Sequence, residues 1–365
     1  MDTQHQSRSG GRTVSDLLRP EIRSLAEYRL RQYPHRIKLN QNENPYELPS
    51  GIKQEIVEKL ASMPWSRYPS FVPQKQIDML AGFTGWTAEG ILIGNGSNEI
   101  LQLLFMSVLD RGASVVLSQP TFTLYKILAR SLGAQVHEVM MDRGFAFNVD
   151  ELIRVTNVNK ATMLVLCSPN NPTGTSLSGR DLQRILDGTR TLVILDEAYI
   201  HFDETSQISL LNKYDRLVIL QTFSKAMGAA GLRFGYSLSS PEIARDLNKV
   251  KLPYNVNVFT LIAAEVLISR WETIRSWIAT IIRERERVRS AMSGIENVVV
   301  YPSGGNFLLF ESIMAAPADV FRRLVDYGIL IRDVSSYPLL GRGLRVTIGK
   351  PEENDEFLHA LRKAI

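Results

Sequence analysis

The sequence predicts an α/β protein with two domains, and three observations lead to this prediction. Its 365 residues exceed the roughly 250–300 residues at which a single hydrophobic core stops growing, so a second, smaller domain is expected. Hydrophobic residues at 44% and charged residues at 22% are close to the averages of soluble globular proteins. Between residues 90 and 240, short apolar runs alternate with helical patterns, which is typical of a mostly parallel sheet flanked by helices.

The N-terminal residues 1–36 are expected to form an arm. They begin as a polar tail and continue with an apolar pattern over residues 17–28, which is too short to build a core of its own. We therefore expect this segment to pack on a larger body.

Residues 37–265 are predicted to form the large domain. Buried strands are expected where consecutive residues are apolar, at residues 91–93, 114–117, 162–166, 192–195, 217–220 and 234–238. Helices are expected between them, at residues 97–110, 121–132 and 178–187. Because ligands bind at the carboxyl ends of the strands in such sheets, polar residues that follow these strands are candidates for a site.

Residues 266–365 are predicted to form a small α+β domain. A long helical pattern without glycine over residues 261–292 leads into it. The elements expected after that helix are strands at residues 298–302, 306–310, 329–332 and 344–347 and a helix at residues 317–327.

Charge and cysteine content exclude several classes of protein. The net charge of +4 comes from scattered basic residues, which does not indicate a nucleic-acid surface. Residues 283–289 alternate acids and bases, as a solvated helix face does. The single cysteine, Cys167, ends an apolar run, so we expect a buried side chain in a reducing compartment rather than a nucleophile.

Membrane and metal signals are also missing from the sequence. Residues 1–12 lack the apolar core of a secretion signal, and no run approaches the ~18 apolar residues of a membrane span. No clustered histidine and cysteine ligands and no nucleophile elbow appear, so no metal site and no serine or cysteine triad are expected. We expect a cytoplasmic protein.

Lys225 is the first candidate for chemistry. It follows the strand at residues 217–220, where burial would disfavour its charged form, and a neutral amine forms a Schiff base with an aldehyde. Thr222, Ser224 and Arg233 supply donors suited to a phosphate. The alternative is a surface lysine near a turn.

Two further strands end in polar groups. Asp196 ends the strand at residues 192–195 and Tyr199 follows three residues later. A carboxylate can keep a pyridine nitrogen protonated and a phenol can donate to a ring hydroxyl, whereas the alternative is a helix cap and packing. Asn171 lies in a turn rich in proline after residues 162–166, where it would aim an amide at a ligand oxygen or serve the turn alone.

Residues 94–99 pass from a strand into a helix and contain Gly94 and Gly96. The free amides and the dipole of a helix N-terminus favour a phosphate. Glu99 occupies the place of the third glycine of a dinucleotide fingerprint, so a single phosphate fits better. A glycine-rich cap without a ligand is the alternative.

These segments together resemble the histidinol-phosphate aminotransferase family of fold-type I pyridoxal-phosphate-dependent aminotransferases. The resemblance runs over nearly the whole chain and includes residues 38–45, 67–69, 120–125, 330–333 and 344–347. It implies a large domain with a mostly parallel seven-stranded sheet flanked by helices, and a small α+β C-terminal domain.

The resemblance also implies roles for individual residues around pyridoxal 5'-phosphate. Lys225 would hold the cofactor covalently and then move a proton between it and the substrate Cα. Asp196 would pair with the pyridine nitrogen, Asn171 and Tyr199 would contact the ring hydroxyl, and Phe122 would stack on the ring. The residues implied to surround the phosphate are Ser97, Asn98, Thr222, Ser224 and Arg233, with Tyr68 of a neighbouring subunit, so a homodimer is implied.

Substrate contacts follow from the same resemblance. Arg345 would clamp a carboxylate, since its planar fork matches that anion, and Arg332 would meet the phosphate of histidinol phosphate. Tyr28 and Asn44 are the other implied substrate-binding residues. Two positions depart from the family: Phe122 stands where tyrosine is frequent, and residues 26–27 lack the proline that often precedes the tyrosine of the arm. Arg332 could instead form a structural ion pair with Asp333.

The implied reaction is transfer of the amino group of histidinol phosphate to 2-oxoglutarate in histidine biosynthesis. Rival enzymes are an aromatic or broad-range amino-acid aminotransferase and a threonine-phosphate decarboxylase. A non-catalytic regulator with the same fold is a different class, but it would lack Lys225 or carry an added DNA-binding module, and neither applies to this sequence.

Overall fold

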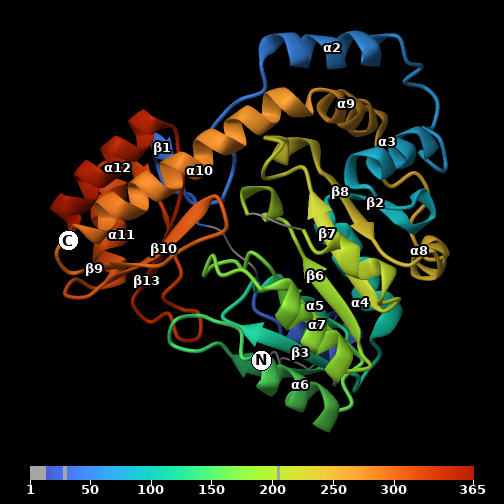
Figure 1. The fold of residues 1–365 in the computed structure, drawn as a ribbon, viewed down its shortest axis with the longest axis horizontal. Coiled ribbons are helices and arrows are strands. Elements are labelled where there is room, and N and C mark those ends of the chain that lie inside the picture. Colours follow the sequence, from blue (N-terminus) through green and yellow to red (C-terminus); the bar gives the residue numbers. More distant parts are fainter. Residues whose placement is uncertain (1–13, 28–30, 204–205) are drawn as a thin grey trace, which may run out of the picture.

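The computed structural model describes residues 14–27, 31–203 and 206–365, and Figure 1 shows its two main sheets. The larger sheet has seven strands, in the order β2-β8-β7-β6-β5-β3-β4. Its strands are β2 (Ile91–Asn95), β3 (Ser114–Gln119), β4 (Gln135–Met140), β5 (Met163–Cys167), β6 (Leu192–Asp196), β7 (Leu217–Thr222) and β8 (Phe234–Leu238). Only β8 is antiparallel to its neighbours, so the predicted mostly parallel sheet is confirmed.

Both faces of this sheet are covered by helices, as its continuous apolar strands require. Along β3, Val115 and Leu117 pack on one face, whereas Val116 packs on the other. The first face carries α4 (Ser97–Val108), α5 (Leu124–Ser131) and α8 (Pro241–Asn248). The second face carries α6 (Val149–Val158), α7 (Gly179–Gly188) and α9 (Val258–Ser269), with α2 (Ser50–Ala61) and α3 (Gln74–Thr84) packed beside α9.

All six predicted strands of this sheet are present, and the seventh, β4, was not among the predicted runs. β4 lies at the edge of the sheet and carries Gln135, His137 and Glu138. Most residues of β4 are partly buried or exposed, and its polar residues are interspersed with Val136 and Val139, so it lacks the continuous apolar run that marked the others.

The C-terminal part contains a four-stranded antiparallel sheet in the order β12-β13-β10-β9. Its strands are β9 (Val298–Val300), β10 (Phe307–Ser312), β12 (Arg332–Asp333) and β13 (Gly343–Thr347), and its helices are α10 (Trp271–Ser293), α11 (Pro317–Asp326) and α12 (Pro351–Ala364). Two short parallel strands, β1 (Ile37–Lys38) and β11 (Ile329–Leu330), also pair. They connect the segment that follows the N-terminal arm to the C-terminal part.

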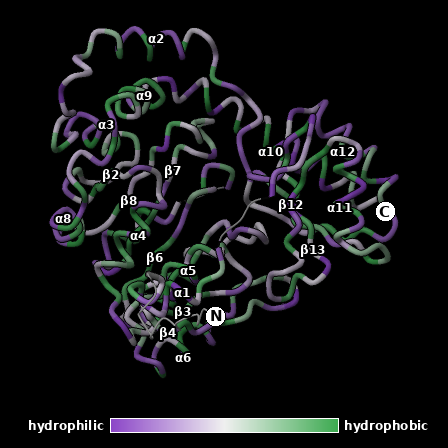
Figure 2. The backbone as a smooth tube through the Cα atoms, turned by 180° about the vertical axis from the view of Figure 1, so that it is seen from behind, coloured by the Kyte–Doolittle hydropathy of each residue, from purple (hydrophilic) through white to green (hydrophobic). Residues whose placement is uncertain are grey.

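Two predictions for the C-terminal part need correction. The helical pattern at residues 261–292 is two helices, because Arg270 leaves helical geometry at φ −102° and ψ 18°. Buried α9 is green in Figure 2, whereas α10 is amphipathic. The run at residues 329–332 is split between β11 and β12, which belong to different sheets. The domain boundary at residue 266 falls inside α9, and the boundaries stay a prediction.

Residues 283–289 are not uniformly solvated, contrary to the prediction. Arg285 is 8% exposed, and its Nη1 donates to the carbonyl oxygens of Phe202 and Gly305, at 3.0 Å each. Arg287 and Arg289 form i,i+3 ion pairs nearer the surface, with Glu284 and Glu286 respectively.

The described part of the arm packs on α5. The Arg19 guanidinium donates to the carbonyl oxygen of Ser131 at 2.9 Å, and Glu21 of α1 (Pro20–Arg23) forms an ion pair with Arg111 at 2.6 Å. The arm therefore lies on a larger body, as expected from its short apolar pattern.

Candidate active site

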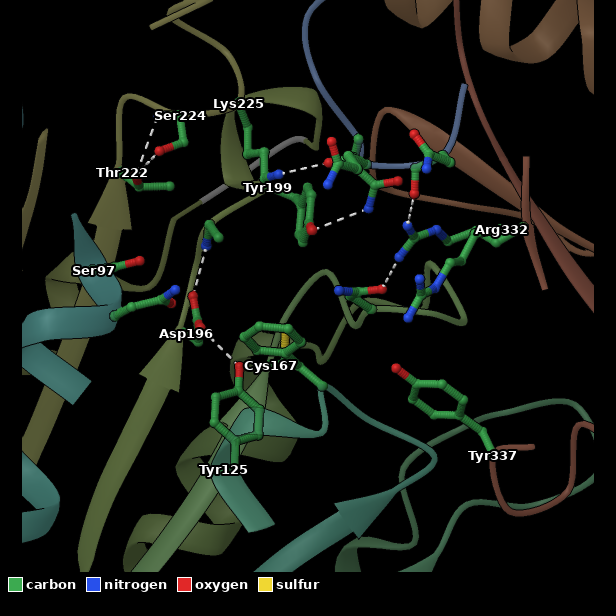
Figure 3. Close-up of a pocket in the computed structure, with 18 of the residues that line it drawn as sticks. Ser97, Tyr125, Cys167, Asp196, Tyr199, Thr222, Ser224, Lys225, Arg332 and Tyr337 are labelled. Carbon is green, nitrogen blue, oxygen red and sulfur yellow. Dashed lines mark hydrogen bonds between the residues drawn. The ribbon is translucent and has the colours of Figure 1, made fainter. Parts of the chain in front are cut away.

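A cavity opens at the carboxyl ends of β3, β5, β6 and β7, where the large sheet meets β12 and β13 (Figure 3). This is the place where parallel sheets bind ligands. The predicted site residues that line it are Ser97, Asn98, Phe122, Asn171, Asp196, Tyr199, Thr222, Ser224, Lys225, Arg233, Arg332 and Arg345. The tertiary structure thus brings together residues that are spread over about 250 positions of the chain.

Lys225 lies just beyond β7 and is half-buried at the cavity wall. Its Nζ donates to the carbonyl oxygen of Gln41 at 2.9 Å. Burial, followed by the charges of Arg345 and Arg233, lowers the pKa of Lys225 to about 8. A substantial fraction of the amine is therefore neutral near pH 8, which is the form that attacks an aldehyde.

We expect the pKa of Lys225 to set the rate at which apoprotein binds pyridoxal phosphate covalently. The neutral amine becomes the main form above a pKa of about 8, so the rate should rise with pH and level off above that value. Stopped-flow absorbance from pH 6 to 10 measures this rate. A rate that still climbs steeply at pH 10 would contradict the prediction, because an ordinary lysine has a pKa of 10.5.

Asp196 lies at the floor of the cavity and is 4% exposed. Its Oδ2 accepts a hydrogen bond of 2.7 Å from the Tyr125 hydroxyl, and its Oδ1 accepts one of 3.1 Å from the backbone of Ala198. Burial raises the pKa of Asp196, whereas the hydrogen bond from Tyr125 lowers it. A carboxylate held in this way can share a proton with a basic ring nitrogen above it.

Tyr199 and Asn171 face the same cavity from two different strand ends. The Tyr199 hydroxyl accepts a hydrogen bond of 3.0 Å from Nδ2 of Asn42, and burial raises the pKa of Tyr199 above its usual range. Oδ1 of Asn171 accepts a hydrogen bond from Nη1 of Arg345. The neighbouring Asn170 instead braces the turn, because its Nδ2 donates to the carbonyl oxygen of Pro120 at 2.8 Å.

A candidate phosphate cradle lies at the N-terminus of α4. Gly235 allows close approach of β8, because a Cβ there would lie 2.2 Å from the backbone nitrogen of Ser97. At Gly96, with φ +76°, a Cβ would lie 2.5 Å from the Arg233 guanidinium. Nη1 of Arg233 donates to Ser224 Oγ at 3.3 Å, and Thr222 Oγ1 donates to the same oxygen at 3.0 Å.

The carboxylate of Glu99 does not line this cradle but stabilises the loop beside it. Its Oε2 accepts hydrogen bonds from the backbone of Asn95 at 2.6 Å and from the amide of Asn255 at 2.7 Å. The residue that breaks the dinucleotide fingerprint therefore fixes the loop that precedes α4. The cluster of helix amides, hydroxyls and a guanidinium suits one phosphate group.

Two arginines on neighbouring strands line the outer part of the cavity. Arg332 of β12 pairs with Arg345 of β13 in register. Arg345 is 7% exposed, and its Nη2 donates to the carbonyl oxygen of Asn40 at 2.7 Å. Within the described ranges, Arg332 forms no ion pair, and the Asp333 carboxylate accepts a hydrogen bond from the backbone of Ser335.

Two predicted residues of the described part of the chain do not line this cavity. Asn44 donates to the carbonyl oxygen of Ala226, the neighbour of Lys225, at 2.9 Å, so it supports the lysine segment rather than facing a substrate. Tyr68 is 80% exposed and stacks on Tyr254 at 4.5 Å between ring centroids. Tyr28 lies outside the described residues.

The structure adds cavity residues to which the sequence analysis gave no role: Asn40, Gln41, Asn42, Tyr125, Cys167 and Tyr337. Four of them lie inside segments 38–45 and 120–125, which carried the family resemblance, so a residue-by-residue reading of those segments could have found them. Cys167 is buried, as predicted, and its pKa is raised above the usual range by burial. Nothing in the local sequence marks Tyr337.

Comparison with known proteins agrees with this geometry. The family described as aminotransferase class I and II matches residues 34–361. The chain belongs to this family. A histidinol-phosphate aminotransferase of Chlorobaculum tepidum is 36% identical over 349 residues, which cover 95% of this chain and 100% of that protein. This similarity also places the chain in the histidinol-phosphate aminotransferase family, and the protein is a pyridoxal-phosphate-dependent aminotransferase.

Solved structures share the fold of this aminotransferase. The histidinol-phosphate aminotransferase of Sinorhizobium meliloti, in complex with pyridoxal 5'-phosphate, has a TM-score of 0.86 at 22% identity and covers 98% of each chain. An L-threonine-O-3-phosphate decarboxylase of Porphyromonas gingivalis has a TM-score of 0.78 at 24% identity and covers 90% of this chain and 98% of its own. At these identities the similarity shows the fold alone.

Over residues 14–27, 31–203 and 206–365, none of the helices combines the length and the hydropathy of a membrane span. No group of three or more histidine, cysteine, aspartate or glutamate side chains is placed to hold a metal ion there.

Proposed function

We propose that this aminotransferase moves the amino group of histidinol phosphate to 2-oxoglutarate, yielding imidazole-acetol phosphate and glutamate in histidine biosynthesis. The observation that carries the proposal is the pairing of Arg345 and Arg332 across β13 and β12 at the mouth of a cofactor cavity. One arginine is anchored in the wall, and the other has no carboxylate partner within the described part of the chain. The similarity to the histidinol-phosphate aminotransferase of Chlorobaculum tepidum supports the same substrate.

The residues around the cofactor can perform transamination. Bound pyridoxal phosphate supplies an aldehyde and a ring that stabilises negative charge at the substrate Cα. The neutral amine of Lys225 would accept the Cα proton and pass it to the cofactor, which its lowered pKa permits. Asp196 keeps the ring nitrogen protonated, while Tyr199 and Asn171 orient the ring hydroxyl.

The remaining lining residues hold the cofactor in place. Phe122 lies edge-on to Tyr125, at 5.6 Å between centroids, and we assign it to stacking on the ring. The residues assigned to the phosphate are Ser97, Asn98, Thr222, Ser224 and Arg233. A fixed ring and phosphate leave the scissile bond of the substrate oriented relative to Lys225.

Each of the two arginines is assigned to a different anionic group of the substrates. Arg345 is assigned to the carboxylate of glutamate or 2-oxoglutarate, since its planar guanidinium is held in one orientation by Asn171 and the Asn40 carbonyl. Arg332 is assigned to the phosphate of histidinol phosphate. Tyr28, in the arm, keeps the role that the family resemblance implies.

Two rival reactions use the same cofactor residues. An aromatic or broad-range aminotransferase would prefer phenylalanine or tyrosine as donor, and a decarboxylase would release carbon dioxide from threonine phosphate. Transamination with 2-oxoglutarate over a panel of amino acids and histidinol phosphate, together with a decarboxylation assay, separates the three. We expect histidinol phosphate to give the highest kcat/KM, and a far better phenylalanine donor would reject the proposal.

Replacing Arg332 by alanine should selectively lower the activity of the enzyme with the phosphorylated substrate. We expect kcat/KM for histidinol phosphate to fall by about 10²-fold, since a charge-assisted contact to phosphate is lost, and to fall much less for glutamate. Steady-state kinetics with both donors measure the difference. Arg322→Ala, which changes an arginine with a 70% exposed side chain on α11, is the matched control. Equal losses for both donors would make Arg332 a structural residue.

We further propose a homodimer with shared active sites, working in the cytoplasm. Tyr68 is exposed and does not line the cavity of its own chain, so it can reach a cofactor phosphate in a partner. Exposed apolar side chains around it support an interface, namely Trp65, Phe71, Val72, Leu252 and Tyr254. Isolated proteins seldom expose such a patch. The single cysteine suits a reducing compartment.

A hybrid dimer tests whether the sites are shared. Lys225→Ala and Tyr68→Ala chains are each expected to be impaired, but a mixed dimer has one site with neither change. Co-expression of the two variants with different tags, followed by tandem purification, should therefore restore turnover. A hybrid no more active than the Tyr68→Ala dimer, or a mass in solution equal to the 41.1 kDa of one chain, would contradict the proposal.

A further inference from the structure

Tyr337 lies in the loop between β12 and β13, and that loop is fixed at both ends. Val334 and Leu340 are buried in a cluster with Met141 and Phe145, which follow β4 of the large sheet. The backbone N–H of Tyr337 donates to the carbonyl oxygen of Val334 at 3.0 Å, and that of Leu340 donates to the carbonyl oxygen of Tyr337 at 3.1 Å. The direction of the Tyr337 side chain is therefore set by the fold.

The Tyr337 hydroxyl faces the cavity that holds Lys225. Figure 3 shows it pointing inward from the same side as the Arg332 side chain. Over the described ranges, neither the Tyr337 hydroxyl nor the Arg332 guanidinium has a hydrogen-bond partner. Arg345 differs, because Asn171 and the Asn40 carbonyl already engage it. The outer wall thus presents two donors without an acceptor.

We propose that Tyr337 determines specificity by donating a hydrogen bond to the phosphate of an O-phosphorylated amino substrate, beside Arg332. This inference rests on the proposed function. It assigns to Tyr337 the binding of the substrate phosphate, which lies at the end of the substrate remote from the amino group. Tyr337 does not touch the reacting atoms. Its contribution is to substrate binding and to the choice between substrates.

The number of donors favours a phosphate monoester over a carboxylate. A guanidinium fork engages two oxygens, so each oxygen of a carboxylate already has a donor. A phosphate monoester has three terminal oxygens and a charge of about −1.5 to −2 near neutral pH, so one oxygen is left for a further donor. The phenol of Tyr337 lies on the wall where that oxygen would project.

Replacing Tyr337 by phenylalanine removes the hydroxyl and keeps the ring that packs on Val334 and Leu340. We expect kcat/KM for histidinol phosphate to fall about tenfold, the size typical of one hydrogen bond to a charged group, mainly through KM. The fall should be at least about fivefold smaller for glutamate and for histidinol, which lacks the phosphate. Tyr327→Phe, at an exposed position after α11, is the matched control.

A binding measurement separates this inference from the proposed function. Titration calorimetry of the holoenzyme with glycerol phosphate, a phosphate monoester without an amine, should show a higher dissociation constant for Tyr337→Phe than for wild type. If wild type fails to use histidinol phosphate but this difference is present, the proposed function is wrong and the assignment of Tyr337 stands. Equal losses for all three donors, or unchanged binding of glycerol phosphate, would overturn the assignment.

Discussion

Lys225→Ala is expected to abolish both the covalent attachment of pyridoxal phosphate and transamination. Lys225 is the amine whose Nζ reaches the cavity beside Asp196 and Tyr199, with its pKa lowered to about 8. Removing a general acid–base group alone costs about 10²–10⁴-fold in rate, and here the same residue also holds the cofactor. The visible absorbance of the protein and its turnover with histidinol phosphate measure the two losses.

A lysine outside the cavity provides the control for that variant. Lys249→Ala changes a side chain that is 68% exposed and paired with Asp246, so colour and turnover should stay at wild-type levels. Thermal unfolding of both variants separates a fold defect from a chemical one. Turnover retained in Lys225→Ala would mean that another group moves the proton, and the mechanism would be wrong.

Asp196→Asn should leave pyridoxal phosphate attached but lower kcat by about 10²–10³-fold, the size typical of removing one preorganised electrostatic contact. The asparagine keeps the shape of the side chain, but its single oxygen replaces only one of the two oxygens that accept hydrogen bonds from Tyr125 and Ala198. It cannot carry the negative charge that keeps the ring nitrogen protonated. Single-turnover kinetics with histidinol phosphate would measure the rate of the proton-transfer step.

The control and the contradicting outcome for this prediction use the same assay. Asp150→Asn removes a carboxylate whose side chain is 83% exposed, and its rate should match wild type. Asp196→Glu keeps the charge and should recover part of the lost rate. A normal kcat in Asp196→Asn would show that the ring does not depend on this carboxylate.

Much of the large sheet could be predicted because its strands are buried on both faces. The runs that became β5, β6 and β7 are apolar at consecutive positions, and the chemistry follows directly in Asn171, Asp196 and Lys225. Strands that are buried on one side only carry a weaker signal, which is why β4 was missed. The break at Arg270 was missed because both α9 and α10 have helical sequences, so only packing shows where one helix ends.

The sequence by itself determined the cofactor chemistry of this aminotransferase, since β6 ends in Asp196, and Asn171 and Lys225 follow β5 and β7 within four positions. Only the tertiary structure decided the substrate side of the site. Arg332 and Arg345 become neighbours through the pairing of β12 with β13, and Tyr337 joins them because Val334 and Leu340 anchor its loop. Such contacts depend on strand register and loop packing, which leave no local pattern in the chain.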